Sequence, residues 1–93
     1  MIAFGQGQTS GAPMPQGVFD RVRLDRSIRI VLRGSRTDLD VSQKELANRI
    51  GWTRNQIANL EGGRRSVHLT DFLKIAKALN VDPLTLLNRV LRW

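Results

Sequence analysis

The side chains best suited to specific hydrogen bonding lie between residues 53 and 65. Ile57 and Leu60 are spaced to face a core if this stretch is helical. The helical period then turns five polar or small residues outward: Arg54, Asn55, Ala58, Asn59 and Gly62. Arginine can donate two hydrogen bonds to a guanine edge, and asparagine can donate to and accept from an adenine. This outer face carries no carboxylate, so it is typical of a helix that enters a DNA major groove, about 12 Å wide.

Groups suited to hold phosphate flank this face. The helix before it presents unpaired amides at its N-terminus, and Gln43 stands beside them. Thr53 can contribute its hydroxyl, whereas Gln56 can reach a base or a phosphate but has a competing role in capping the helix. Such contacts position a protein on DNA without reading sequence. The predicted phosphate contacts are Gln43, Thr53, Gln56, Gly63, Arg64 and Arg65.

Capping residues predict where the two short helices of this region begin. Ser42 with Glu45, and Thr53 with Gln56, have the spacing of a capping box. Each box has its hydrophobic staple: Val41 with Leu46, and Trp52 with Ile57. Between the helices, Gly51 can adopt the left-handed conformation that ends a helix and lets the chain turn. The pattern therefore predicts a helix, a tight turn and a second helix.

Three more helices are predicted outside this region, which gives an all-α fold of five helices. The first runs from about Phe19 to Gly34, and a polar connection covers Ser35–Asp40. Its buried stripe is Leu24, Ile28, Val31 and Leu32. A fourth helix spans the apolar positions of residues 69–79, and Asp82 with Pro83 begins a fifth.

The last helix carries apolar residues on two sides. One stripe is Leu84, Leu87 and Leu91, and the other is Leu86, Val90 and Trp93. One stripe can enter the core, and the other needs a partner. Because about seventy folded residues bury a thin core, we predict a homodimer and assign its interface to Leu86, Val90 and Trp93.

The charge of the chain indicates a polyanionic partner. Fifteen basic residues stand against eight acidic ones, which gives a net charge of +7 in 93 residues. Phospholipid would also attract such a protein, so charge alone only narrows the class of partner. Residues 1–18 are uncharged and rich in glycine, and we expect a flexible neutral tail there, followed by one domain at residues 19–93.

The composition argues against an enzyme and against a membrane protein. One histidine, no cysteine and no tyrosine leave no pair of nucleophile and base, and we expect neither a metal nor another cofactor. His68 is expected at a loop or helix start. No apolar run approaches the roughly 18 residues of a membrane span, so we expect a soluble, cytoplasmic protein associated with the nucleoid through DNA binding.

Residues 43–61, QKELANRIGWTRNQIANLE, resemble the helix-turn-helix of the Cro and lambda-repressor-like (XRE) DNA-binding family. Ala47 matches the small residue where the helices cross, Gly51 the turn glycine, and Ile57 and Leu60 the buried positions of the second helix. The resemblance extends over about residues 20 to 90. One departure is the connection at residues 34–40, which is longer than is usual in the family.

The resemblance implies a five-helix lambda-repressor-like domain with the helix-turn-helix at helices 2 and 3. It also implies sequence-specific binding to double-stranded DNA, with base contacts from Arg54, Asn55 and Asn59. The expected function is a transcriptional regulator that acts as a repressor and binds a palindromic operator as a homodimer. The alternative is an antitoxin that binds a toxin protein and represses its own operon. A structural module with a vestigial motif comes third, but that would favour acidic or bulky residues on the outer face.

Overall fold

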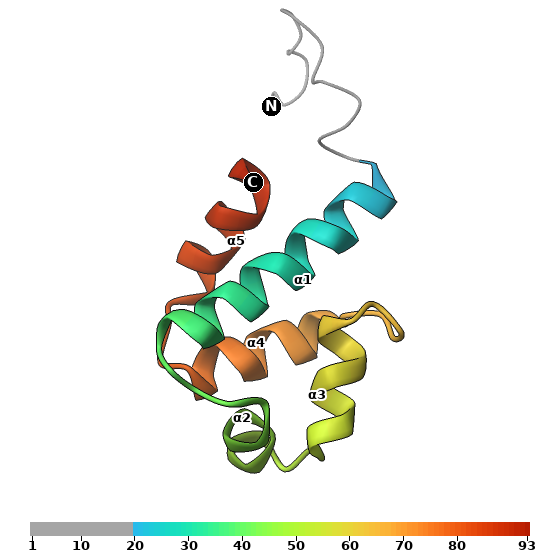
Figure 1. Ribbon diagram of the computed structural model, residues 1–93. Helices are drawn as coiled ribbons and strands as arrows, with labels where there is room; N and C mark the ends of the chain where they lie inside the picture. The colour runs from blue at the N-terminus through green and yellow to red at the C-terminus, as the bar shows by residue number, and fades with distance from the viewer. Residues whose placement is uncertain (1–19) are drawn as a thin grey trace, which may run out of the picture.

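The computed structural model describes residues 20–93, and this part of the chain forms five α-helices without a strand (Figure 1). They are α1 (Arg21–Asp38), α2 (Gln43–Ile50), α3 (Arg54–Glu61), α4 (Leu69–Ala78) and α5 (Pro83–Arg92). The all-α prediction is confirmed. The predicted flexible tail, residues 1–18, lies outside the described residues.

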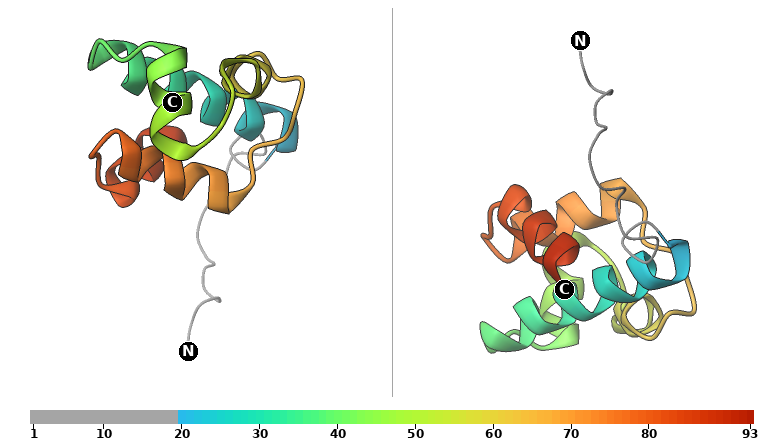
Figure 2. Two further views of the ribbon diagram at one scale, coloured as in Figure 1. Left: turned by 90° about the horizontal axis from the view of Figure 1, so that it is seen from below. Right: turned by 90° about the horizontal axis from the view of Figure 1, so that it is seen from above.

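Helix α1 is the longest of the five helices. In both views of Figure 2, α1 runs along one side of the molecule and α4 and α5 lie together on the other. The helix packs against α3, α4 and α5, while α2 packs against α3 and α4. No helix within residues 20–93 has the length and apolar character needed to cross a membrane.

Side-chain caps set the start of four helices. Asp20 accepts a hydrogen bond from the Arg23 amide at 3.1 Å, and Asp82 accepts one from the Leu84 amide at 3.1 Å. Ser42 caps α2 by accepting from the Glu45 amide at 3.0 Å. The predicted capping box at this helix is only half formed, because the Glu45 carboxylate pairs with Arg49 at 2.7 Å instead of reaching back to residue 42. The box at α3 is complete.

The core lies between the five helices, and each of them contributes buried residues to it. Six large side chains are less than 2% exposed: Leu32, Leu46, Ile57, Leu60, Ile75 and Leu86. The predicted stripe of α1 enters the core at Val31 and Leu32, whereas Leu24 and Ile28 are half-buried. Burial of these groups removes apolar surface from water and is the main favourable contribution to folding.

The prediction for the end of the first helix was wrong. Helix α1 continues through Asp38, four residues past Gly34, and only Leu39–Ser42 connect it to α2. Ser35 and Arg36 are buried because each lies one helical turn after a core residue of the same face. The long connection at residues 34–40, and with it the apparent departure from the family pattern, is therefore absent from this structure.

The assignment of the two stripes on the last helix was also wrong. Leu86 and Val90 are 0% and 3% exposed and belong to the core of this chain. The outer stripe is the other one, since Leu84, Leu87 and Leu91 are 72%, 44% and 51% exposed. Trp93, the third residue of the predicted interface, is exposed beyond the last turn of α5.

Candidate nucleic-acid interface

The turn between α2 and α3 holds the two helices against each other. Gly51 has φ of +74°, a conformation that L side chains rarely adopt, and ends α2. The carbonyl of Ala47 accepts from the amides of Gly51 and Trp52, the latter at 2.8 Å. Ala47 is itself 1% exposed, and its small side chain lets the helices approach. The turn predicted between the two capped helices is therefore present.

Helix α3 presents the polar face that the sequence predicts. Ile57 and Leu60 are fully buried, and Arg54, Asn55 and Asn59 are exposed. Gly62 is also exposed, whereas Ala58 is half-buried. The three predicted base contacts are thus brought together on one surface of one helix.

A capping box ties the first turn of this helix together. The Gln56 amide donates to the Thr53 hydroxyl at 3.2 Å, and the Gln56 side-chain oxygen accepts from the Thr53 amide at 2.8 Å. The capping box uses the side-chain oxygen of Gln56 as an acceptor, and the side-chain NH2 group of Gln56 can still donate. The Thr53 hydroxyl accepts within the box and can still donate its own proton. Both residues are exposed and keep a donor for an anion.

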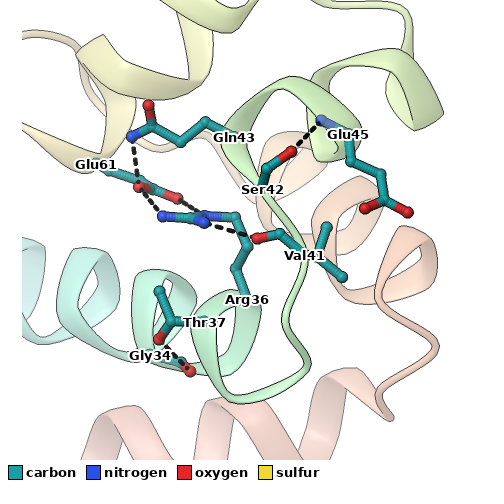
Figure 3. A network of polar contacts seen from close by, with 8 residues as sticks. All are labelled: Gly34, Arg36, Thr37, Val41, Ser42, Gln43, Glu45 and Glu61. Carbon is teal, nitrogen blue, oxygen red and sulfur yellow. Dashed lines mark hydrogen bonds and ion pairs between the residues drawn. The ribbon is translucent and has the colours of Figure 1, made fainter.

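The last residue of α3 points inward, to a buried arginine (Figure 3). Arg36 and Glu61 have side chains only 9% and 5% exposed and form a two-pronged ion pair, with Nε–Oε2 at 2.7 Å and Nη2–Oε1 at 3.0 Å. The remaining Nη1 group of Arg36 donates to the Val41 carbonyl at 2.7 Å. The pair therefore joins the end of α1, the following loop and the end of α3.

Gln43 belongs to the same network. Its Nε2 donates to Glu61 Oε1 at 3.0 Å, which ties the first residue of α2 to the last residue of α3 (Figure 3). The side chain is half-buried and has a second N–H that this bond does not use. The side chain of Gln43, a predicted phosphate contact, is thus fixed in place by its hydrogen bond to the Glu61 carboxylate.

The Arg36–Glu61 pair was missed by the sequence reasoning. Arg36 was assigned to a polar connection, and Glu61 received no role. Two signals were available: Arg36 follows the buried Leu32 by four residues, and Glu61 follows the buried Ile57 by four. Both residues therefore lie on the inward sides of their helices, where a charge must find an opposite charge.

The glycine pair after α3 does not expose free amides as predicted. The amides of Gly62, Gly63 and Arg64 donate to carbonyls of α3, at 2.8, 3.3 and 2.9 Å respectively. The prediction that the Gly63 amide binds phosphate is therefore corrected, since the end of the helix already uses that amide. Position 63 favours glycine for a conformational reason, because its φ of +81° is rarely adopted by residues with a side chain.

The two arginines of the loop have different surroundings. Arg65 donates to Asp71 at 2.9 Å, and its guanidinium lies 4.5 Å from the centre of the Trp52 ring. Asp71 is buried and also accepts from the His68 amide at the start of α4. Arg65 thus joins the loop to the turn region and to α4, and its phosphate contact stays a prediction for the N–H groups that Asp71 does not use. Arg64 is exposed, and the side-chain bond that it forms within residues 20–93 is a long one, 3.4 Å to Asn59 Oδ1.

The described residues hold no cluster of three or more histidine, cysteine, aspartate or glutamate side chains that could bind a metal ion. The surface around α3 is instead built from arginine, amide and hydroxyl groups. Such groups suit hydrogen bonds to base edges and phosphate oxygens.

Comparison with known families and proteins shows which of them this chain is similar to. A family model described as Helix-turn-helix matches residues 32–86, more than half of the chain. An "Uncharacterized HTH-type transcriptional regulator" of Methanothermobacter thermautotrophicus is 44% identical over 52 residues, which are 56% of this chain and 75% of that protein.

Two solved structures share the fold. A mutant of the restriction-modification controller protein C.Esp1396I superposes with a TM-score of 0.71 over 75% of this chain and 93% of its own, at 18% identity. The clp gene regulator ClgR of C. glutamicum superposes with a TM-score of 0.67 over 72% of this chain and 87% of its own, at 25% identity.

Proposed function

Because this chain belongs to the helix-turn-helix family and is a DNA-binding transcriptional regulator, we propose that it reads the major groove with α3. The observation that carries the proposal is the outer face of that helix. Arg54, Asn55 and Asn59 are exposed there, whereas Ile57 and Leu60 of the same helix are fully buried. The first turn of α3 carries no acidic residue, so no carboxylate opposes the approach of a phosphate backbone.

Arg54 and Asn55 lie at the N-terminal end of α3, the part of a recognition helix that reaches base edges. Arginine at this place favours guanine, and asparagine favours adenine. Asn59 lies one turn later, and its side-chain oxygen is within 3.4 Å of Arg64. The Asn59 amide group is then the part of that side chain left to donate to a base.

Four predicted phosphate contacts remain in the proposal. Gln43, at the first position of α2, has a free N–H, and Thr53 and Gln56 keep one donor each at the start of α3. Arg64 adds a charged donor at the far end of α3. Groups at both ends of α3 would thereby hold the backbone on the two sides of the groove and fix the angle of the helix.

We propose a homodimer that binds a palindromic operator, with an interface different from the one expected. Exposed leucines of α4 and α5 form an apolar surface: Leu69, Leu73, Leu84, Leu87 and Leu91. Between these helices lies an apolar hollow of about 460 Å³. Monomers rarely expose large contiguous apolar patches, and a second copy would cover this one by two-fold symmetry. Recognition helices about 34 Å apart would then meet successive turns of the groove.

The regulator would act as a repressor by occupying its operator in the cytoplasm, on the DNA of the nucleoid. The relatives are named as a transcriptional regulator, a controller protein and a gene regulator, and these names favour regulation over the antitoxin alternative.

Selection from random DNA duplexes tests the proposal. The wild-type protein should enrich a two-fold symmetric site, whereas a double variant Arg54→Ala, Asn55→Ala should retain non-specific binding and enrich none. A matched double variant on the outer side of α4, Lys74→Ala with Lys77→Ala, should enrich the wild-type site. Enrichment of the same site by the Arg54 and Asn55 variant would contradict the assignment of α3.

A further inference from the structure

One arginine of α1 lies against the loop that follows α3. The guanidinium of Arg29 covers the α-carbon of Gly63 so closely that a methyl group added there would lie 3.0 Å from Arg29 Cζ and Nε. The first half of α1 and the loop between α3 and α4 lie on the same side of the molecule, as Figures 1 and 2 show. Two segments more than thirty residues apart thus share one surface.

The two segments enclose a small polar hollow of about 220 Å³. It is lined by Asp25 and Arg29 of α1 and by residues 63–67 of the loop, which include Arg64 and Arg65. Among residues 20–93, Arg29 forms no ion pair, and Arg64 makes only the long bond to Asn59. The charge of Arg65 is balanced by Asp71. The one carboxylate that lines the hollow, Asp25, lies 3.9 Å from Arg21, and the two arginines that line it with Asp25 have no acidic partner among these residues.

We propose that this hollow is a binding site for a backbone phosphate of DNA, held between Arg29 of α1 and Arg64 of the loop. The proposal rests on the proposed function and extends its interface to a helix outside the helix-turn-helix. Guanidinium groups bind phosphate through paired N–H donors, and two of them from separate elements can hold one phosphate from two sides. Gly63 is needed at this point, because its positive φ turns the loop and its missing side chain leaves room for Arg29.

Arg29→Ala tests the site, with Arg23→Ala as its control. Arg23 is an exposed arginine of the same helix, six residues earlier and therefore about 120° around the axis. Each neutralised phosphate contributes a slope of about 0.9 to log affinity against log salt, which corresponds to about eightfold between 1 M and 0.1 M salt. Arg29→Ala should lower the slope by about 0.9 on operator and scrambled duplexes alike. Arg23→Ala should change it by less than half as much.

Asp25→Asn should change the affinity for DNA in the opposite direction. Removing the carboxylate from the hollow should strengthen binding to both duplexes, and Asp38→Asn, the same change near the other end of α1, should strengthen it less. If Arg29→Ala behaved as Arg23→Ala while the wild type kept its steep slope, the site would be refuted and the proposed function would stand. A wild-type slope near zero would refute both.

A soluble phosphorylated molecule would use the same chemistry. Thermal unfolding with inorganic phosphate, against chloride at equal ionic strength, separates the two sources. We expect phosphate to raise the Tm of the wild type and of Arg29→Ala equally, because a backbone phosphate is also placed by contacts elsewhere on the duplex. A stabilisation that required Arg29, with an unchanged duplex slope, would identify a small-anion site and overturn the proposal.

Discussion

The arginines around α3 have three different environments, although the sequence presents them as similar. Arg36 is buried against Glu61, Arg65 is stacked on Trp52 and paired with Asp71, and Arg54 and Arg64 are exposed. Only an exposed guanidinium without a carboxylate partner can exchange water for DNA at small cost. Location relative to the acidic residues, more than residue type, therefore decides which arginines bind DNA.

Arg54→Ala and Arg64→Ala should separate reading from anchoring. Loss of Arg54 should remove base discrimination, about 1–3 kcal/mol for a bidentate contact, with little change in the salt slope on scrambled duplexes. Loss of Arg64 should weaken binding to all duplexes and lower the slope by about 1. Fluorescence anisotropy on operator and scrambled duplexes at several salt concentrations measures both. An operator-to-scrambled ratio unchanged by Arg54→Ala would show that α3 is wrongly assigned.

Glu61→Ala should destabilise the fold far more than Glu45→Ala. The first change leaves Arg36 charged and buried without its partner, which costs about 3–5 kcal/mol in comparable pairs. Glu45 pairs with Arg49 on the surface, where such a contact contributes about 0.3–0.5 kcal/mol. Urea unfolding of both variants measures the difference. Equal losses of unfolding free energy would mean that the buried pair contributes no more than the exposed one.

At the level of helices, local chemistry predicted the five elements but not all their limits. Capping residues and apolar spacing are local, and they placed the starts of α2, α3 and α5 correctly. Arg36, near the end of α1, pairs with Glu61, which lies 25 residues later and is not part of the helical pattern of α1. The inner side of α5 could not be chosen either, because both stripes are apolar and only contact with the other helices decides.

The candidate site was predictable to the same extent. The outer face of α3 follows from the spacing of two buried residues. The roles of Gly63 and Arg65 do not, since they depend on carbonyls of the helix end and on Asp71 and Trp52. The proposed role of Arg29 was not predictable for the same reason, because its neighbour is a glycine of a distant loop.

Two glycine substitutions should shift stability in opposite directions. Gly51→Ala forces an alanine into φ of +74° and should cost about 1 kcal/mol or more. Gly34→Ala lies inside α1, with open space where its side chain would stand, and should stabilise by about 0.5–1 kcal/mol. Thermal and urea unfolding would measure both effects. A stabilising Gly51→Ala would contradict the left-handed turn between α2 and α3.

At the level of the whole molecule, most arginines and most exposed leucines lie on different surfaces. Most arginines of the described residues lie on α1 and near α3, and five of the six exposed leucines lie on α4 and α5. The DNA-binding surface and the surface proposed for dimerisation can therefore be changed independently.

Leu84→Glu should give a monomer if the proposed dimer exists. Its side chain is 72% exposed in the chain, so the fold should tolerate the charge, while a two-fold interface would bring two carboxylates together. Val22→Glu, at a residue 76% exposed on α1, is the matched control and should leave the mass unchanged. Light scattering gives the mass, and titration of a palindromic duplex gives the loss of affinity. An unchanged mass for Leu84→Glu would place the dimer contact elsewhere.

The stacking of Arg65 on Trp52 gives the protein an optical reporter. The chain has two tryptophans, and only Trp52 lies in the helix-turn-helix, half-buried under a guanidinium whose loop faces the proposed DNA. Trp93 stands at the end of α5, 57% exposed. In a Trp93→Phe variant the remaining emission should come from Trp52 alone. Its intensity and wavelength should then change when a duplex displaces water from this loop, so that binding can be followed by stopped-flow without a label on protein or DNA.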